Sequence, residues 1–336
     1  MTTDAQTQNG EPADPEDLLG APTPDDWKLE PEQHAARLDP KAAALKRVLE
    51  HSLIQAIMRR YDRYDEEAGV QQAVYKKYGS REIYLAAAAA ILGGVVLVMN
   101  DARNVSPAYD YLRTGLLLLQ LVCAAGVVGM KYILQAGKSF QAWQKSRSQA
   151  ETARIELFET ACGLARDWQD EQRAGDYPLL PLQLEYFIRY QLMVQVVYYD
   201  KRGKQHQAAS KRYVGFGAIV TFIAAIAAGL GGLAFEFIDT VSVASIAAMA
   251  APVLLGMQTS LSRLNQDERN AARYEITHAH LEKLRGKCSD IRKAAAAGDA
   301  ATVHAFIRDV DQIISVEHSQ WISQLAEKDI AEVREQ

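Results

Sequence analysis

The sequence predicts an all-α membrane protein with two tandem transmembrane helical hairpins and long cytoplasmic helices. The strongest indication is the stretch 213–262, two uncharged runs separated by a short turn that carries Glu236 and Asp239. A second pair of apolar runs precedes it, and no segment alternates apolar and polar residues with the period of a β-strand. Because helices satisfy their own backbone hydrogen bonds in lipid, the apolar runs are expected to cross a membrane as helices.

The later pair of runs, 213–235 and 240–262, gives the clearer membrane signal. Each run has 23 residues, and at about 1.5 Å rise per residue it spans about 35 Å, more than a hydrocarbon core of about 30 Å. A buried helical hairpin inside a large soluble core is the alternative. The glycines of these runs and Pro252 favour the bilayer, where both residue types are more frequent in helices.

The earlier pair, 83–99 and 114–130, is weaker. Each run has 17 residues, close to the lower limit for a spanning helix. Five consecutive alanines, Ala86 to Ala90, add little drive for insertion. We therefore expect the two helices to help each other insert by packing their small-residue faces together.

Polar helices are expected on both sides of each pair. The first has an apolar stripe at steps of three or four residues, made of Leu45, Leu49, Leu53, Ile57, Tyr61 and Tyr64. The other amphipathic segments are 138–168, 182–212, 263–285 and 299–335.

The expected domain organisation follows from composition. Residues 1–40 hold ten acidic residues and many prolines, which is typical of a disordered tail. Residues 41–169 form a first two-helix membrane unit, the Gly- and Pro-containing segment 170–181 is a linker, and residues 182–336 form a second unit. The order of elements is the same in both units, and this indicates a tandem duplication.

Basic residues set the expected orientation. They flank the outer ends of both pairs, whereas the turns hold only Arg103 and Arg113. The positive-inside bias places the long helices and both termini of this multi-pass protein in the cytoplasm. The start of the chain has no signal-peptide pattern, in agreement with this orientation.

Composition and motifs argue against catalysis. The net charge of −5 gives no reason to expect a nucleic-acid partner. The sequence has no Walker loop, HExxH, GxSxG or dinucleotide fingerprint, so neither an enzyme nor a cofactor is expected. His278 and His280 lie on different sides of a helix, so with Cys288 they predict no metal site.

One group of candidate residues lies inside the predicted spans. Gln120, Thr221 and Gln258 are the polar side chains there, away from the turns. An amide in lipid is costly unless it faces another helix or water. Gln120 is the most expensive of the three and is therefore the candidate for lining a pore.

A second group, the candidate cytoplasmic contact face, follows the first pair. Arg147, Glu151 and Arg154 lie at i, i+4 and i+7 on one helical face. They form either a surface ion-pair ladder or a contact between subunits. Trp143, one turn earlier, is either a packing residue or a platform for a ligand.

The segment from Phe140 to Glu159 resembles the W-x-x-x-R-x-x-A-E-x-x-R signature of SLATT domains. The matching residues are Trp143, Arg147, Ala150, Glu151 and Arg154. The second half resembles a different SLATT subfamily in the helix from Tyr186 to His206 and in the closing segment from Val316 to Trp321. It departs from the signature where Leu264 stands at the place of the tryptophan.

SLATT domains are two-helix membrane domains found beside nucleotidyltransferases and SLOG nucleotide sensors in bacterial conflict systems. The resemblance implies an effector that perforates or perturbs the bacterial inner membrane when a nucleotide signal or a sensor partner triggers it. We therefore expect a homo-oligomeric pore in antiphage defence. The alternative is a membrane-anchored scaffold that binds a partner without conducting ions.

Overall fold

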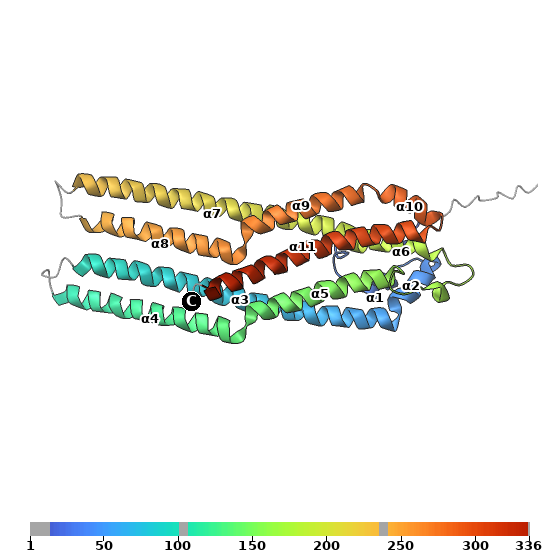
Figure 1. The fold of residues 1–336 in the computed structure, drawn as a ribbon, viewed down its shortest axis with the longest axis horizontal. Coiled ribbons are helices and arrows are strands. Elements are labelled where there is room, and N and C mark those ends of the chain that lie inside the picture. The colour runs from blue at the N-terminus through green and yellow to red at the C-terminus, as the bar shows by residue number, and fades with distance from the viewer. Residues whose placement is uncertain (1–13, 101–106, 235–240, 335–336) are drawn as a thin grey trace, which may run out of the picture. The chain divides into compact units, whose positions relative to one another are not determined.

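The computed structural model describes residues 14–100, 107–234 and 241–334, and these residues contain helices and no β-strand. The predicted all-α class is confirmed for them. In chain order (Figure 1), the elements are η1 (Asp17–Leu19), α1 (Pro31–Ala36), η2 (Pro40–Ala42), α2 (Ala43–Glu50), α3 (Ser52–Asn100), α4 (Pro107–Gly137), α5 (Ser139–Ala161), η3 (Gln169–Glu171), α6 (Leu179–Phe187), the π-helical turn η4 (Ile188–Leu192), α7 (Met193–Ala234), α8 (Val241–Asn265), α9 (Asp267–Arg285), α10 (Cys288–Ala296) and α11 (Ala300–Arg334).

The helices group into two compact units, and each unit takes segments from both halves of the chain. Unit 1 comprises the residues up to Glu66, Ser146–Lys201 and the residues from Tyr274. Unit 2 comprises Glu67–Lys145 and Arg202–Arg273. This division separates polar from apolar helix segments, whereas the sequence predicted two consecutive membrane units.

The predicted linker 170–181 lies inside unit 1. Arg47 of α2 holds it there by donating hydrogen bonds to the carbonyl oxygen of Glu171 and to the carboxylate of Asp176. The segment thus packs against α2 as part of the unit.

Unit 1 has one continuous apolar core. Its largest fully buried side chains include Trp168, Tyr186, Phe158 and Phe187, from the α5 end, the following loop and α6. The predicted stripe of the first polar helix contributes Leu45, Leu49 and Ile57, but Leu53 is 38% exposed. His51 has an extended backbone between α2 and α3, so the helical phase restarts and Ile54 takes the core position.

The N-terminal segment corrects one expectation. Residues 1–13 lie outside the described residues, but residues 14–40, predicted as part of a disordered tail, form η1, α1 and the start of η2. Leu18 and Leu19 of η1 are buried in the core of unit 1. Burial of this apolar pair offsets the entropy lost when the surrounding polar residues are ordered.

Unit 2 contains the apolar helix segments. Three described helical stretches are long and apolar enough to cross a membrane: Ser52–Met99, Pro107–Ala161 and Leu179–Ile226. In the most apolar part of each, only 11%, 6% and 6% of the residues are buried. The predicted spans 83–99 and 114–130 lie within the first two stretches, and most of 213–235 lies in the third. Because large apolar side chains face outward, the surface of unit 2 suits lipid.

The fourth predicted span, 240–262, is not among those three stretches. It begins at a residue outside the described ranges and corresponds to α8. Within unit 2 the two helices of each predicted pair contact each other. Tyr109 of α4 donates a hydrogen bond to the carbonyl oxygen of Met99 at 3.2 Å, and Asn265 of α8 lies 3.4 Å from the hydroxyl of Tyr213. That each pair crosses a membrane as a hairpin stays a prediction.

A single residue interrupts the helices after each pair. Lys138, between α4 and α5, has φ of 44°, and Gln266, between α8 and α9, has φ of 54°. Both residues therefore adopt the left-handed conformation that non-glycine residues usually avoid. The two breaks lie at corresponding places in the two halves, an arrangement that the predicted duplication would explain.

Candidate functional site

Gln120 lies against the backbone of the neighbouring helix. A methyl group built on Gly93 of α3 would lie 2.7 Å from Nε2 of Gln120. A side chain at position 93 would require the amide of Gln120 to shift, so the amide lies directly on α3. The structure therefore gives the most costly polar side chain of the first pair a neighbour within the same chain.

The second pair has a similar contact. A methyl group on Gly217 of α7 would lie 2.8 Å from Oε1 of Gln258, whose Nε2 donates a hydrogen bond to the carbonyl oxygen of Tyr213 at 2.5 Å. Thr221 donates its hydroxyl to the carbonyl oxygen of Gly217 at 2.9 Å, one turn earlier in its own helix. Both side chains thus bond to backbone oxygens of α7.

The candidate contact face becomes an ion-pair cluster inside unit 1. Nη1 of Arg147 donates to Oδ1 of Asp65 at 3.0 Å, and Nη2 lies 2.5 Å from Oε1 of Glu151. Nη1 of Arg154 lies 3.6 Å from Oε2 of Glu151, and these two side chains are only 12% and 11% exposed. The cluster therefore joins α5 to α3, with Glu151 and Arg154 shielded from water and with Arg147 and Asp65 32% and 46% exposed.

The surroundings of this cluster keep its charges fixed. The nearby Glu151 raises the pKa of Arg147 above its ordinary value, so the guanidinium stays charged. Burial and the charge of Asp65 raise the pKa of Tyr61 to about 12, so its hydroxyl stays neutral. Tyr199, whose pKa burial also raises, donates a hydrogen bond to Glu317 at 3.2 Å. In this arrangement a charged guanidinium at Arg147 and a neutral hydroxyl at Tyr61 accompany the ion pairs near neutral pH.

Trp143, the remaining residue of that prediction, belongs to unit 2. Its ring lies 5.9 Å from the ring of Tyr75 and 6.0 Å from that of Phe140, and the latter two rings are 4.9 Å apart. This aromatic trio packs α3 against the start of α5. Trp143 therefore has a packing role in unit 2.

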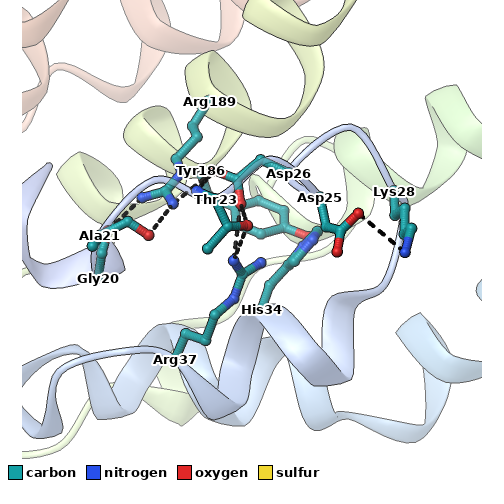
Figure 2. Close-up of polar contacts among 10 residues, drawn as sticks. All are labelled: Gly20, Ala21, Thr23, Asp25, Asp26, Lys28, His34, Arg37, Tyr186 and Arg189. Carbon is teal, nitrogen blue, oxygen red and sulfur yellow. Dashed lines mark hydrogen bonds and ion pairs between the residues drawn. The ribbon is translucent and has the colours of Figure 1, made fainter.

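A further site, missed from the sequence, involves the N-terminal segment (Figure 2). Arg189 in η4 donates hydrogen bonds to the carbonyl oxygens of Gly20 and Ala21 at 2.6 and 2.8 Å and to Asp26 at 2.7 Å. Arg37 donates from the opposite side to Asp26 at 2.9 Å. We call this arrangement the Arg189 clamp.

The backbone at Gly20 makes the clamp possible. Its φ is 75°, and a methyl group there would lie 2.6 Å from the carbonyl oxygen of Arg37. Next to it, His34 stacks on Tyr190 at 3.8 Å and lies 3.1 Å from the hydroxyl of Tyr186. The adjacent leucines at 18 and 19, in an otherwise acidic segment, were the sequence signal for this docking.

Electrostatics fix the ionisation states in the clamp. Burial would raise the pKa of Asp26, but hydrogen bonds from Thr23, Arg189 and Arg37 outweigh it and lower the pKa to about 2. Burial and the nearby Arg37 lower the pKa of His34 to about 4. Near neutral pH the clamp therefore contains a carboxylate between two guanidinium groups and a neutral imidazole.

Asp311 is a buried carboxyl group on the other side of the π-helical turn. Its Oδ1 accepts a hydrogen bond from Nε2 of Gln191 at 3.3 Å, and only 3% of the residue is exposed. Burial raises its pKa to about 7, with a further contribution from Glu159. The π-helical turn aims Arg189 at the clamp and Gln191 at Asp311, and such turns are frequent at functional positions.

The part of the chain that the structure describes contains no group of three or more His, Cys, Asp or Glu side chains placed to hold a metal ion. His278 lies 3.6 Å from Glu282 one turn along α9. The sites described above therefore consist of intramolecular ion pairs, hydrogen bonds and aromatic contacts.

These features define an all-helical membrane protein with a polar helical unit. Residues 187–321 match the family model of SMODS and SLOG-associating 2TM effector domain 1, so this part of the chain carries a SLATT domain. No curated protein and no solved structure matches the chain. The suspected SLATT relationship is thereby confirmed, on the second half of the chain. A tandem SLATT-like unit at 41–169 stays a prediction.

The matched region contains the π-helical turn with Arg189, Gln191 and its partner Asp311, and Gln258. It ends at Trp321, whose side chain lies outside the described residues. The partners of Arg189 in the N-terminal segment precede it. The Arg189 clamp therefore joins a family-matched residue to a segment outside the match.

Proposed function

We propose that this chain is an integral membrane effector whose homo-oligomers open a pore in, or otherwise perturb, the bacterial inner membrane during antiphage defence. The observation that carries the proposal is the match of residues 187–321 to a 2TM effector domain. Outward-facing apolar helices in unit 2 support it, because they would insert into a bilayer without a further anchor.

In this proposal several chains surround the pore. The described parts of the predicted spans carry no Asp, Glu, His, Lys or Arg, so small and weakly polar groups would line the pore. Among these groups, Gln120 is the best placed to line the pore. Because its amide lies on Gly93 in the structure, opening would require α4 to move relative to α3 and expose the amide to water.

The trigger would act on the polar helices. A nucleotide-sensing protein or a nucleotidyltransferase product is the expected signal, and no catalytic step by this chain is needed. Such a signal could act on the docked N-terminal segment of unit 1. One guanidinium, that of Arg189, holds this segment on η4 by three hydrogen bonds, so a ligand that competes for them would release it.

Membrane potential measured after induction tests the pore. With its trigger supplied, the wild-type protein should depolarise cells and release dye, and Gln120→Leu should suppress both while inserting normally. Gln258→Leu serves as the matched control, because that amide bonds to the backbone of α7 near the basic end of the pair. A wild-type protein that causes no depolarisation under these conditions, or that remains a monomer at every concentration, would contradict the proposal.

Cysteine labelling tests the membrane orientation. Single cysteines at Ser106 and Phe237, both outside the described residues, should react with an impermeant reagent in intact cells. One at Ser210 on α7 should react only after lysis. Labelling of the cysteine at position 210 in intact cells would contradict the proposed orientation and the cytoplasmic location of both termini.

One observation favours the alternative, a membrane-anchored scaffold. An open groove of about 370 Å³ lies between α9 and α11 in unit 1, with Ile276, Ile313 and Val316 among its lining. Ile276 and Val316 are 59% and 47% exposed, so an amphipathic helix of a sensor partner could dock there. If the scaffold is correct, the double variant Ile276→Ser and Val316→Ser should abolish function and leave the membrane potential unchanged. The pore does not predict this combination.

A further inference from the structure

Unit 2 carries a concentration of positive charge at one end, which we call the basic collar. Its members come from both helix pairs and the segments that follow them, and all are exposed. They are Lys76, Lys77, Arg81, Lys131, Lys138, Lys145, Arg202, Lys204, Lys211, Arg212, Arg263 and Arg269. Most of these charges also predict the orientation of the protein in the membrane.

Contacts between helices show that the basic stretches lie at a common level of unit 2. Tyr75 packs on Phe140 at 4.9 Å, which joins α3 to α5. A methyl group on Gly79 would lie 2.9 Å from Cδ1 of Leu264, which joins α3 to α8. The contact of Asn265 with Tyr213, at 3.4 Å, joins α8 to α7. Most collar residues lie within about one helical turn of these contact residues, and the contact of His206 with Asp267 brings the stretch that contains Arg202 and Lys204 to the same level. Lys131 lies further along α4, towards the apolar segment.

Few carboxylates offset this charge. In the same stretches only Glu67 and Glu268 are exposed, whereas Glu82 is partly buried and Asp267 is buried. Asp267 lies 2.7 Å from Nδ1 of His206, so its charge is directed into the unit. The exposed surface at this level is consequently dominated by lysine and arginine.

Apolar and aromatic side chains border the collar. Val214 follows Arg212 and is 69% exposed, and Tyr132 follows Lys131 and is 70% exposed. An exposed apolar surface beside a ring of cations matches a phospholipid, whose acyl chains and phosphate lie in the same order. A free phosphate ion would use only the cations and would leave the apolar border without a partner.

We propose that the basic collar binds the headgroups of anionic phospholipids, so that the protein selects an anionic membrane. The phosphates would lie among the collar cations while the acyl chains cover the adjacent apolar surface of unit 2. The proposal rests on residence in a membrane and is independent of whether the protein conducts ions.

The direct test measures lipid binding by the full-length protein in a neutral detergent. Titration with short-chain phosphatidylglycerol should raise the thermal unfolding midpoint, with an affinity at least about tenfold higher than for phosphatidylcholine of the same chain length. About 0.5 M NaCl should remove most of this difference. Equal binding of the two lipids would overturn the proposal. Inorganic phosphate that reproduces the full shift would also overturn it, by showing that the collar binds a free anion.

Variants locate the effect on the collar. A quadruple variant, Lys76→Gln, Lys77→Gln, Lys211→Gln and Arg212→Gln, should weaken phosphatidylglycerol binding more than about tenfold. The matched control removes four exposed basic residues of unit 1, Arg59→Gln, Lys283→Gln, Lys287→Gln and Arg308→Gln, and should bind as the wild type does. Lysine-to-arginine changes at Lys76, Lys77 and Lys211, the three lysines of the quadruple variant, should preserve binding, and circular dichroism verifies the helix content. Equal loss in both quadruple variants would overturn the assignment to the collar.

Because lipid binding is measured in detergent, its failure is distinct from failure of the pore. A protein that depolarises cells but binds both lipids equally would contradict the collar proposal alone. A protein that prefers phosphatidylglycerol but never depolarises cells would contradict the pore alone.

Discussion

Unit 1 and the candidate spans of unit 2 bury polar groups in different ways. In unit 1 the buried polar groups include full charges, which are paired, as in Arg147 with Glu151 or Arg189 with Asp26. In unit 2, the candidate spans instead place uncharged amides, Gln120 and Gln258, against glycine backbones. Their large apolar side chains point outward.

This difference follows from the surroundings that each unit suits. In a water-soluble helical unit a charge can be buried if an opposite charge and hydrogen bonds compensate for its lost hydration. In lipid the same charge has no nearby water, so only neutral polar groups that reach a neighbouring backbone are tolerated cheaply. Continuous helices such as α3 and α7 therefore contain one segment that suits water and another that suits lipid.

The largest expected effect tests the paired charges of unit 1. Glu151→Ala leaves the guanidinium groups of Arg147 and Arg154 without their shared carboxylate, so we expect a loss of about 3 kcal/mol in unfolding free energy. The control is Glu156→Ala on the same helix, because Glu156 pairs with Arg60 at 2.6 Å but is 41% exposed. That change should cost less than about 1 kcal/mol. Chemical unfolding in detergent measures both, and equal costs would remove the contrast between buried and exposed pairs.

Asp311 provides a pH test of the same unit. Because its pKa in the folded state is about 7, well above the unfolded value, the folded protein binds the proton more tightly. The stabilisation is complete below the unfolded pKa and is lost as the pH rises through about 7. Between pH 5.5 and 8 the loss should be about 2 kcal/mol.

The variant Asp311→Asn isolates this contribution. It should flatten the pH dependence of the unfolding midpoint and make the protein more stable than the wild type at pH 8. His34 acts in the opposite sense, because its pKa is lowered to about 4 and its stabilisation is lost as the pH falls below about 6.5. Subtracting the two pH profiles removes the histidine contribution, and identical profiles would show that Asp311 does not titrate near neutral pH.

The glutamines of unit 2 should respond more weakly and with opposite signs. Gln258→Leu removes the hydrogen bond to Tyr213 and should destabilise the protein by about 0.6 kcal/mol. Gln120→Leu removes an amide from the predicted span 114–130 and should leave membrane insertion intact or improve it. Thermal unfolding in detergent, together with an insertion assay of α4, checks both. Destabilisation by both variants to the same extent would show that the two amides are equivalent.

The smallest effect concerns the breaks after the two helix pairs. Lys138→Gly and Gln266→Gly should each stabilise the protein by less than about 1 kcal/mol, because glycine tolerates the left-handed backbone that both residues adopt. The thermal unfolding midpoints of the two variants, compared with that of the wild type, measure this stabilisation. Similar shifts would support the predicted duplication, whereas a shift at one site only would indicate that the two breaks arose separately.

Much of the architecture could be predicted from the sequence. Uncharged runs predicted where the apolar helix segments lie, and spacing predicted both ends of α11 within one residue. These predictions succeed because hydropathy and helical period are local properties of the chain. The predicted helix 138–168 was too long, because α5 ends at Ala161, and the helix predicted from 263 begins as α9 only at Asp267. The resemblance of the helix from Tyr186 and of the segment ending at Trp321 also matched the limits of the SLATT domain closely.

Only the tertiary structure decided how distant residues meet. The sequence placed Arg147, Glu151 and Arg154 on one helical face, but it could not show that Asp65 of α3 completes the cluster. Nor could it show that Arg189 holds an N-terminal segment more than 160 residues away. The composition of that segment is typical of disorder, but burial of Leu18 and Leu19 and the hydrogen bonds from Arg189 hold residues 14–40 in an ordered conformation. Such contacts depend on side chains brought together by packing, whose energy is not a property of any short stretch of sequence.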